Sequence, residues 1–498
     1  MNYYSKLLPD LLSHSNGAIG RHLNIKNRPL NDYLKQLLSS SLGDKNCLMG
    51  DVVFEPTFGW QTAIPTLDDL IDDLLDPELI KAMDMSNGEI NQDYRFPKSS
   101  RPYVHQQEAW RLLSQKIAQS VVVTSGTGSG KTECFLIPIL SDLISQQRQL
   151  NQPLEGVQAL LIYPLNALIA SQRERLDAWT RRFGSDVRFC LYNRTLPYWG
   201  ITEKSNQVLD RNSLWESPPP ILVTNATMLE YMLLRKTDES ILSMSKGKLK
   251  YIVLDEAHSY LGAKAAELTL LLRRVMLAFG VTSEQVRFIA TSATLGGTES
   301  EKQLQQFLAA VSGLPLNRVH VVKGSRYIPK LDRGNLQYRQ ATYQELQTLD
   351  KDKLYKALSA NQIAIFLRNQ FIKENNITQP KTLLSLHQVL SSHLHEPITI
   401  FDTLQWIDLL SYAKSKEGQA FLPLRMHVFH SILNGVWACI NPNCVLKHNT
   451  LSAQKWPFGS IYLCQRNFCD CGEPVFEVRP CFHCNGQVKQ ETISGSLS

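Results

Sequence analysis

Short apolar runs alternate with longer amphipathic stretches between residues 96 and 325. Five of these runs are rich in β-branched residues and are followed by polar residues and a helix-like stretch, which predicts buried strands at 121–123, 159–163, 221–224, 251–254 and 286–290. Strands that alternate with helices predict a parallel sheet covered by helices on both faces. Because ligands of such sheets bind at the carboxyl ends of the strands, the polar residues after each run are candidates for one shared site.

The flanking parts of the chain show helical periodicity instead. Residues 67–75 form an acidic stretch that predicts a helix with a solvated face, and residues 354–367 and 383–394 repeat apolar positions at i, i+3 and i+4. The pattern predicts four parts: a helical accessory region (1–95), an α/β domain (96–325), a helical linking domain (326–435) and a cysteine-rich segment (436–498).

Composition and charge narrow the class of protein only slightly. The 498 residues are 43% hydrophobic and 20% charged, which is ordinary for a protein of several domains. The net charge of +6 permits a polyanionic partner without requiring one. The longest apolar run, 159–170, is interrupted by Pro164 and Asn166 and is too short to span a bilayer, and the N-terminus lacks the layout of a secretion signal. We therefore expect a cytoplasmic protein with no membrane partner.

A glycine-rich stretch after the first predicted strand indicates a phosphate site. Its glycines let successive backbone N–H groups point at a polyphosphate, while Lys131 is expected to meet the β- and γ-phosphates of ATP and the Thr132 hydroxyl to hold Mg²⁺. A helix from Glu133 to Leu143 would face the same anion with its positive end. The usual motif has glycine at the position of Ser125, a small change that leaves the loop feasible. The predicted nucleotide-contacting residues are Ser125, Gly126, Thr127, Gly128, Ser129, Gly130, Lys131, Thr132 and Glu133.

Two carboxylates follow the predicted strand at 251–254, in the sequence Asp255-Glu-Ala-His258. Asp255 is expected to contact Mg²⁺ through water, and Glu256 to orient and deprotonate the attacking water. After the strand at 286–290, the hydroxyl-rich turn 291–294 is placed to sense the phosphates. The predicted catalytic residues are Lys131, Thr132, Asp255 and Glu256.

These motifs, in this order, resemble those of superfamily 2 helicases of the DEAD/DEAH kind over residues 100–312. The resemblance implies a RecA-like ATP-binding domain, in which Gln106 recognises adenine and Tyr103 stacks or packs beside it. It also implies that motif II and motif III residues couple ATP hydrolysis to movement; these residues are His258, Ser292, Ala293 and Thr294.

The same resemblance implies contacts with nucleic acid. Loops at the positions of the family's motifs Ia and Ib would hold the backbone of DNA or RNA, with little sequence preference and a strong salt dependence. The residues concerned are Pro164, Leu165, Asn166, Thr224 and Asn225. Five nearby arginines either add positive charge to this site or form an ordinary exposed helix face: Arg173, Arg175, Arg181, Arg182 and Arg194.

A narrower resemblance lies in the Tyr260-Leu-Gly262 spacing and the following helix that ends in Leu-Arg-Arg274, which are similar to the large-helicase-related group and to helicases of bacterial anti-phage defence.

Such helicases close a second RecA-like lobe over ATP with an arginine finger, and no strand–helix series follows residue 312. We therefore expect an ATP-dependent helicase or translocase whose second lobe lies in the same longer protein or in a partner chain. The alternative is an ATP-regulated nucleic-acid clamp or scaffold without turnover.

Seven of the ten cysteines crowd between residues 439 and 484, in C-x4-C, C-x-C-G and C-x2-C-x-G arrangements. Zn²⁺ favours four thiolate or imidazole ligands in a tetrahedron, so the cluster predicts one structural zinc site. The spacing does not decide which four residues bind. The candidates are Cys439, Cys444, Cys469, Cys471, Cys481 and Cys484, with Cys464 and His483 as spares.

Overall fold

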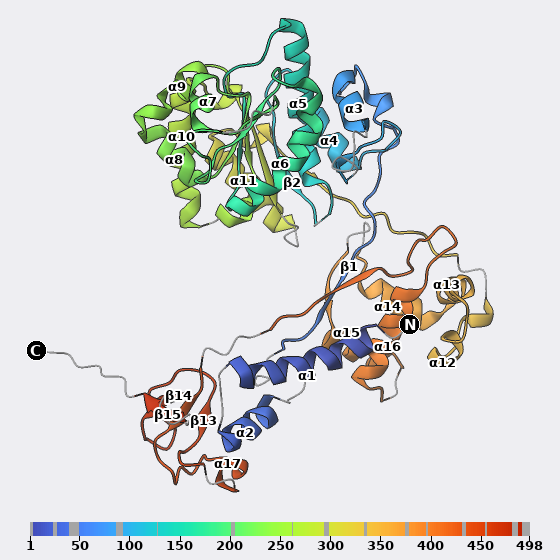
Figure 1. Ribbon diagram of the computed structural model, residues 1–498. Helices are drawn as coiled ribbons and strands as arrows, with labels where there is room; N and C mark the ends of the chain where they lie inside the picture. The colour runs from blue at the N-terminus through green and yellow to red at the C-terminus, as the bar shows by residue number, and fades with distance from the viewer. Residues whose placement is uncertain are drawn as a thin grey trace, which may run out of the picture. The chain divides into compact units, whose positions relative to one another are not determined.

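The computed structural model forms two compact units, residues 59–327 and residues 1–58 together with 328–498, which are described separately (Figure 1). The four-part division expected from the sequence stays a prediction. The structure describes residues 3–22, 27–38, 49–85, 93–126, 128–200, 205–260, 262–292, 298–332, 336–373, 378–394, 397–430, 435–453, 456–480 and 487–490.

The unit of residues 59–327 contains the predicted parallel sheet, with eight strands in the order β5-β4-β6-β3-β7-β8-β2-β9. All neighbouring strands pair in parallel. The five expected strands are present, and the pattern missed β4, β5 and β9 because two are very short and only two of the five positions in β9 are buried. The strands are β2 Ser120–Thr124, β3 Ala159–Ile162, β4 Phe189–Leu191, β5 Gln207–Val208, β6 Ile221–Thr224, β7 Tyr251–Leu254, β8 Arg287–Ser292 and β9 Val319–Lys323.

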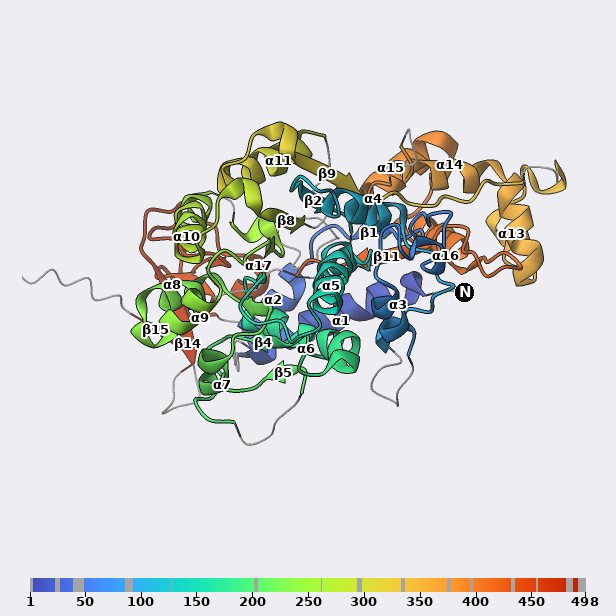
Figure 2. The same ribbon diagram turned by 90° about the horizontal axis from the view of Figure 1, so that it is seen from above.

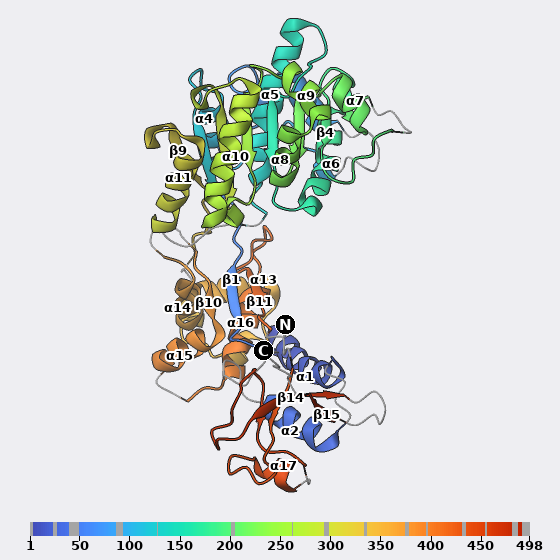
Figure 3. The ribbon, with the colours of Figure 1, turned by 90° about the vertical axis from the view of Figure 1, so that its left-hand side faces the viewer.

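Helices cover both faces of this sheet, as Figures 2 and 3 show. Alternate residues of each strand enter different cores; Val121 and Val123 pack on one side, and Val122 packs on the other. One face carries α3 Pro77–Asp84, α4 Val104–Leu113, α5 Lys131–Leu150 and α6 Asn166–Thr180. The other carries α7 Arg211–Glu216, α8 Ala226–Leu234, α9 Glu239–Met244, α10 Ala263–Phe279 and α11 Thr298–Ser312.

The helix predicted for the acidic stretch 67–75 is wrong. Only a single 3₁₀ turn, Asp68–Leu70, forms there, and Asp72 then adopts a left-handed conformation with φ of 65°. The turn brings Leu67, Leu70 and Leu75 into one core, where each is buried. The next residue, Asp76, caps α3 with its carboxylate, so a helix that continued into α3 would lose this cap.

The second unit is mainly helical, as predicted for its central part, and it also contains a three-stranded sheet in the order β10-β1-β11. The Asp408 carboxylate accepts hydrogen bonds from the backbone N–H groups of Tyr4 at 2.6 Å and Ser5 at 3.0 Å, which caps the first helix from a distant part of the chain. The elements are α1 Tyr4–His22, β1 Val53–Pro56, α12 Tyr343–Leu346, α13 Lys351–Ala360, α14 Gln362–Gln370, β10 Lys381–Thr382, α15 Leu383–Leu394, α16 Ile400–Tyr412 and β11 Leu424–His427.

The cysteine-rich segment of the same unit forms a small antiparallel sheet in the order β13-β12-β14-β15. A separate apolar cluster joins this segment to the second helix of the chain through Leu30, Leu34 and Trp456. Within the described residues, no helix combines the length and apolar character that a membrane span requires. The elements are α2 Arg28–Leu38, β12 Trp437–Cys439, α17 Asn449–Ala453, β13 Ile461–Tyr462, β14 Val475–Pro480 and β15 Gln487–Gln490.

Candidate functional site

The glycine-rich loop joins the end of β2 to the start of α5 at Lys131. Gly128 and Gly130 have φ angles of 70° and 69°, and a Cβ at Gly130 would lie 2.2 Å from the Gln106 Nε2 atom. Only glycine fits that position. Ser125, which stands where the usual motif has glycine, places its hydroxyl 2.5 Å from that of Ser129 and so braces the loop. Thr127 lies outside the described residues.

The structure brings the predicted lysine and carboxylates to one edge of the sheet. Lys131 Nζ lies 3.8 Å from Glu256 Oε1. The Thr291 hydroxyl donates to Asp255 and accepts the backbone N–H of Glu256 at 3.1 Å. These groups follow β2, β7 and β8, which are neighbours in the sheet, so the topology accounts for their convergence. Their catalytic roles stay a prediction.

Burial raises the pKa of Asp255, the hydrogen bond from Thr291 opposes that shift, and the negative charge of Glu256 adds to it. Lys131 lowers the same pKa by its positive charge. Glu256 has a φ of 51°, a conformation that is strained for a residue with a side chain by about 1–3 kcal/mol. Strain of this kind concentrates at functional sites.

Residues at the start of α4 form a wall beside the loop. The Gln106 side chain accepts the Tyr103 N–H at 2.8 Å and donates to the Gly130 carbonyl at 3.2 Å. Both ends of this amide are therefore bonded to the backbone, and adenine recognition by Gln106 stays a prediction. Tyr103 stacks on His105 with ring centroids 5.6 Å apart. The His105 Nε2 atom lies 2.8 Å from the Ser129 carbonyl, and burial lowers the pKa of His105.

The wall also contains residues that the sequence analysis missed. The Arg326 guanidinium lies 3.5 Å from the ring centroid of Trp60. A Cβ at Gly126 would lie 3.2 Å from Arg326 Nη2 and 3.5 Å from the Trp60 ring, so both side chains border the loop. They come from segments outside the recognised motifs, and no local pattern indicated them.

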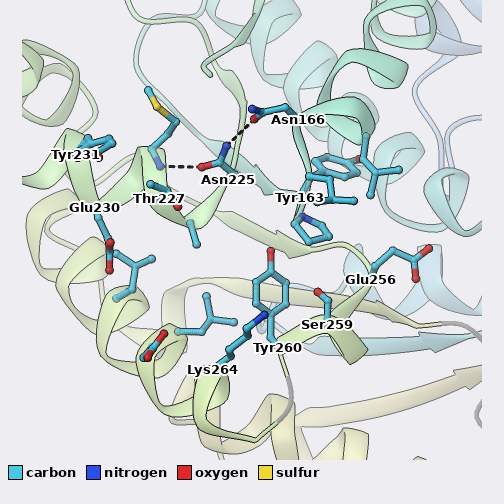
Figure 4. A pocket seen from close by; sticks show the side chains of 18 of the residues that line it. Tyr163, Asn166, Asn225, Thr227, Glu230, Tyr231, Glu256, Ser259, Tyr260 and Lys264 are labelled. Atoms are coloured by element: carbon cyan, nitrogen blue, oxygen red, sulfur yellow. Dashed lines mark hydrogen bonds between the residues drawn. The ribbon is translucent and has the colours of Figure 1, made fainter. Parts of the chain in front are cut away.

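A cavity of about 1120 Å³ opens beside the carboxylates (Figure 4). It is lined by the predicted nucleic-acid residues Pro164, Leu165, Asn166 and Asn225 and also by Glu256 and His258. Asn225 donates to the Asn166 side chain at 2.8 Å and accepts the Met228 N–H at 2.8 Å, which caps α8.

Thr224 is corrected by the structure. Its side chain is fully buried, and its hydroxyl donates to the Tyr192 carbonyl at 2.7 Å. The residue therefore fixes the end of β6 instead of facing the cavity. Sequence position alone placed it with Asn225, but consecutive residues of a strand point to opposite sides.

Of the five arginines proposed near the cavity, some pair with carboxylates and one lines the cavity. Carboxylates on neighbouring elements hold three of them: Arg175 pairs with Glu133 at 3.3 Å, Arg182 pairs with Glu78 at 2.9 Å, and Arg181 pairs with Asp177. Of the five, Arg194 lines the cavity. The Glu133–Arg175 pair instead joins the nucleotide-loop helix α5 to α6.

Other side chains of the cavity wall were not predicted. Arg235 lies 4.7 Å from the ring centroid of Tyr231, and Arg211 lies 5.4 Å from that of Tyr192. These cations, with Lys264 and the hydroxyl of Tyr260, face a space that also contains acidic residues. The Tyr260-x-Gly262 spacing was the one sequence signal that pointed to this wall. The acidic lining residues are Glu230, Glu256 and Glu267.

Two of the four predicted coupling residues, His258 and Ser292, belong to the described part of the chain. His258 Nδ1 is 3.3 Å from Glu256 Oε2, and His258 also lines the cavity. Ser292 is fully buried at the end of β8. Ala293 and Thr294 lie outside the described residues.

Comparison with known proteins identifies the domain that carries these sites. The family model of the DEAD/DEAH box helicases matches residues 103–302. These residues form a DEAD/DEAH box helicase domain. The motif order predicted from the sequence is thereby confirmed at the level of the family, and the RecA-like fold agrees with it.

Relatives of this helicase domain are much longer proteins. The Druantia protein DruE of Escherichia coli is 25% identical over 74% of this chain and 27% of its own length. The uncharacterized ATP-dependent helicase YprA of Bacillus subtilis is 26% identical over 54% of this chain and 32% of its own length. A crystal structure of the DUF1998 helicase MrfA bound to DNA is 21% identical and covers 64% of this chain and 38% of that one, with a TM-score of 0.38. The chain spans about a third or less of the two curated relatives.

Outside the helicase domain, four of the six candidate cysteines come together. The sulfur atoms of Cys439, Cys444, Cys469 and Cys471 all lie within 4.8 Å of one another, and two of the pairs are 3.6 Å apart. Zinc–thiolate bonds of about 2.3 Å in a tetrahedron place sulfurs about 3.8 Å apart, so this donor set fits Zn²⁺. Cys464 is exposed and is not part of the group. Cys481, Cys484 and His483 lie outside the described residues.

Within this cysteine group the environment favours thiolate at Cys469, whereas burial raises the pKa of Cys439 to about 12. Burial opposes ionisation of Cys469, but hydrogen bonds from the Cys471 backbone, the Tyr462 hydroxyl and the neighbouring thiols lower its pKa to about 7. Thiolate is the form that binds metal. A Cβ at Gly459 would lie 2.7 Å from the Cys444 Cβ, so the backbone approaches the group closely on this side.

Proposed function

We propose that this chain is the first half of an ATP-dependent helicase or translocase motor that binds ATP and a nucleic-acid strand. The observation that carries the proposal is the position of Glu256. Its carboxylate lies 3.8 Å from Lys131 of the phosphate loop, and the residue also lines the cavity that contains Asn166 and Asn225. A strand bound in this cavity would therefore lie against the residue that acts on ATP.

The phosphate loop and the two carboxylates have different expected roles. Lys131, the loop amides and the N-terminus of α5 would bind the triphosphate, while Thr132 and Asp255 would hold Mg²⁺, which would supply positive charge to the phosphates. Glu256 orients the attacking water and takes its proton. The strained backbone of Glu256 and the Thr291 bridge keep these two acids in fixed positions.

Turnover would need a second RecA-like lobe in the same longer protein or in a partner chain. An arginine finger from such a lobe contributes about 10³ to 10⁵ in rate where it has been measured in related phosphoryl-transfer enzymes. The family resemblance, and the share of the relatives' length that this chain spans, support this arrangement. The likeness to the Druantia protein DruE favours a role in anti-phage defence.

A second candidate function is a clamp that binds ATP and nucleic acid without turnover. It is favoured by the single parallel sheet of this type among the described residues, which provides one side of an ATP site. The two candidates differ in turnover: the motor hydrolyses ATP once its second lobe is supplied, whereas the clamp has no turnover of its own.

We also propose that Cys439, Cys444, Cys469 and Cys471 hold one structural zinc ion. All four positions of a tetrahedron would then be filled by protein, so the metal would stabilise the small sheet and would not act in catalysis.

The motor proposal is tested by ATP binding and by nucleic-acid-stimulated hydrolysis, measured on this chain and on the longer protein that contains the second lobe. Lys131→Ala is expected to abolish both activities, whereas Glu256→Gln is expected to retain ATP binding and lose hydrolysis. Unchanged turnover in both variants would refute the motor. Hydrolysis by residues 1–498 alone would exclude the clamp.

A further inference from the structure

Tyr260 has a buried hydroxyl at the wall of the cavity. The residue ends the 3₁₀ turn Ala257–Tyr260, which follows the two carboxylates directly. The side chain lines the cavity, the residue is only 8% exposed, and its hydroxyl has no hydrogen-bond partner among the described residues. Figure 4 shows the phenol pointing into the cavity, toward the side on which Asn225 and Asn166 lie.

A hydroxyl in this position can form a hydrogen bond with a bound ligand. Buried polar groups are nearly always hydrogen-bonded, and one that is aimed into an open cavity can be satisfied by a ligand there. Burial raises the pKa of Tyr260 to about 12, with a further contribution from Asp255. The phenol therefore stays protonated at neutral pH and can donate a hydrogen bond.

The surroundings of the hydroxyl indicate an anionic acceptor. The N-terminus of α8, capped by Asn225, contributes positive potential to the cavity. Four cations line the walls, against three acidic groups, one of which is Glu256 at the edge nearest the ATP site. The cations are Arg194, Arg211, Arg235 and Lys264.

We propose that the Tyr260 hydroxyl donates a hydrogen bond to a phosphate oxygen of the nucleic-acid strand bound in this cavity; this inference rests on the proposed function. It assigns a positioning role to the tyrosine of the Tyr-x-Gly segment. The contact would also link strand binding to the ATP site, because Ser259 N–H donates to the Glu256 carbonyl at 2.9 Å within the same turn. A strand that holds Tyr260 would thereby hold Glu256.

Tyr260→Phe tests this assignment, because it removes one oxygen and no hydrogen bond within the described protein. Affinities of the full chain for oligo-dT and oligo-rU are measured by fluorescence anisotropy. A hydrogen bond to a charged oxygen corresponds to a loss of about tenfold or more in affinity, expected equally for both strands. In the completed motor, the strand concentration that half-saturates ATP hydrolysis rises by a similar factor, while binding of an ATP analogue does not change.

Tyr251→Phe is the control for loss of a buried tyrosine hydroxyl away from the cavity, since Tyr251 is buried at the opposite end of β7 and its side chain bonds to Asp142. Its affinity for both strands is expected to equal that of the wild type. Unchanged affinity in Tyr260→Phe, with normal binding by the wild type, overturns the inference alone. A loss confined to oligo-rU also overturns it and assigns the contact to a ribose hydroxyl. Absence of binding by the wild type refutes the proposed function, and the inference falls with it.

Discussion

Thr291→Val is expected to destabilise the protein in a pH-dependent way. The Thr291 hydroxyl donates to the Asp255 carboxylate and accepts the Glu256 N–H at 3.1 Å, and all of this lies in a buried environment. Valine keeps the shape of threonine but removes both interactions. A hydrogen bond to a charged group is worth about 1.5–3 kcal/mol, and an unsatisfied N–H costs about 1–3 kcal/mol, so a loss of about 3–5 kcal/mol in unfolding free energy is expected at neutral pH.

The sign of the pH dependence follows from Asp255. Burial raises the pKa of Asp255 in the folded protein, so the ionised carboxylate destabilises the folded state. This destabilisation is absent below the unfolded pKa and becomes complete as the pH rises through the folded pKa. The Thr291 hydrogen bond lowers that pKa and so reduces the cost. Without this bond the pKa rises further, and the destabilisation caused by Thr291→Val should be larger at pH 7 than near pH 4, by about 1–2 kcal/mol.

The assay is urea unfolding at pH 4 and pH 7, with Thr291→Ser as a variant that keeps the hydroxyl. Thr269→Val is the matched control, because the Thr269 hydroxyl donates at 2.7 Å to the backbone carbonyl of Ala265, a group that does not titrate. Its effect should be the same at both pH values. An equal cost of Thr291→Val at pH 4 and pH 7 would refute the assigned interaction with the Asp255 carboxylate.

Two further substitutions have controls built into the chain. Gly130→Ala should lower the unfolding free energy by about 1–3 kcal/mol more than Gly128→Ala. The two glycines have similar φ angles, but only a Cβ at Gly130 would meet Gln106. Equal losses of unfolding free energy, measured by urea unfolding, would contradict this. Cys469→Ser should lose the bound zinc, measured as metal content of the purified protein, while Cys464→Ser should keep it. Equal metal content in the two variants would exclude the proposed ligand set.

Local patterns predicted the parts of this protein that depend on neighbours in sequence. The Ser125–Thr132 loop and the carboxylates at Asp255 and Glu256 each follow a short apolar strand, and the rule that strand ends share one edge was enough to predict that they meet. The sequence also predicted a cysteine cluster, but it left six candidates because spacing does not determine which turns of a small sheet face one another.

The contacts that the sequence missed join distant segments. Thr291 bridges the two acids from another strand, Arg175 pairs with Glu133 across two helices, and Asp408 caps the first helix of the chain. No periodicity encodes such pairs. The prediction of a helix over residues 67–75 was wrong for a related reason. Its leucines have helical spacing, but contacts with a tertiary core determine how they are buried.

In the proposed motor, the turn that carries Glu256 would be the structural link between ATP and nucleic acid. On one side, Thr291 and Lys131 fix the positions of the two acids; on the other, His258 and Tyr260 face the cavity. The turn is short, contains a strained residue and is closed by the hydrogen bond from Ser259 to Glu256, so its residues have little freedom to move independently. A ligand that displaces Tyr260 would then also act on the backbone of Glu256. In the proposed motor, coupling of strand binding to hydrolysis would require no long pathway through the domain, because both sites share one turn of backbone.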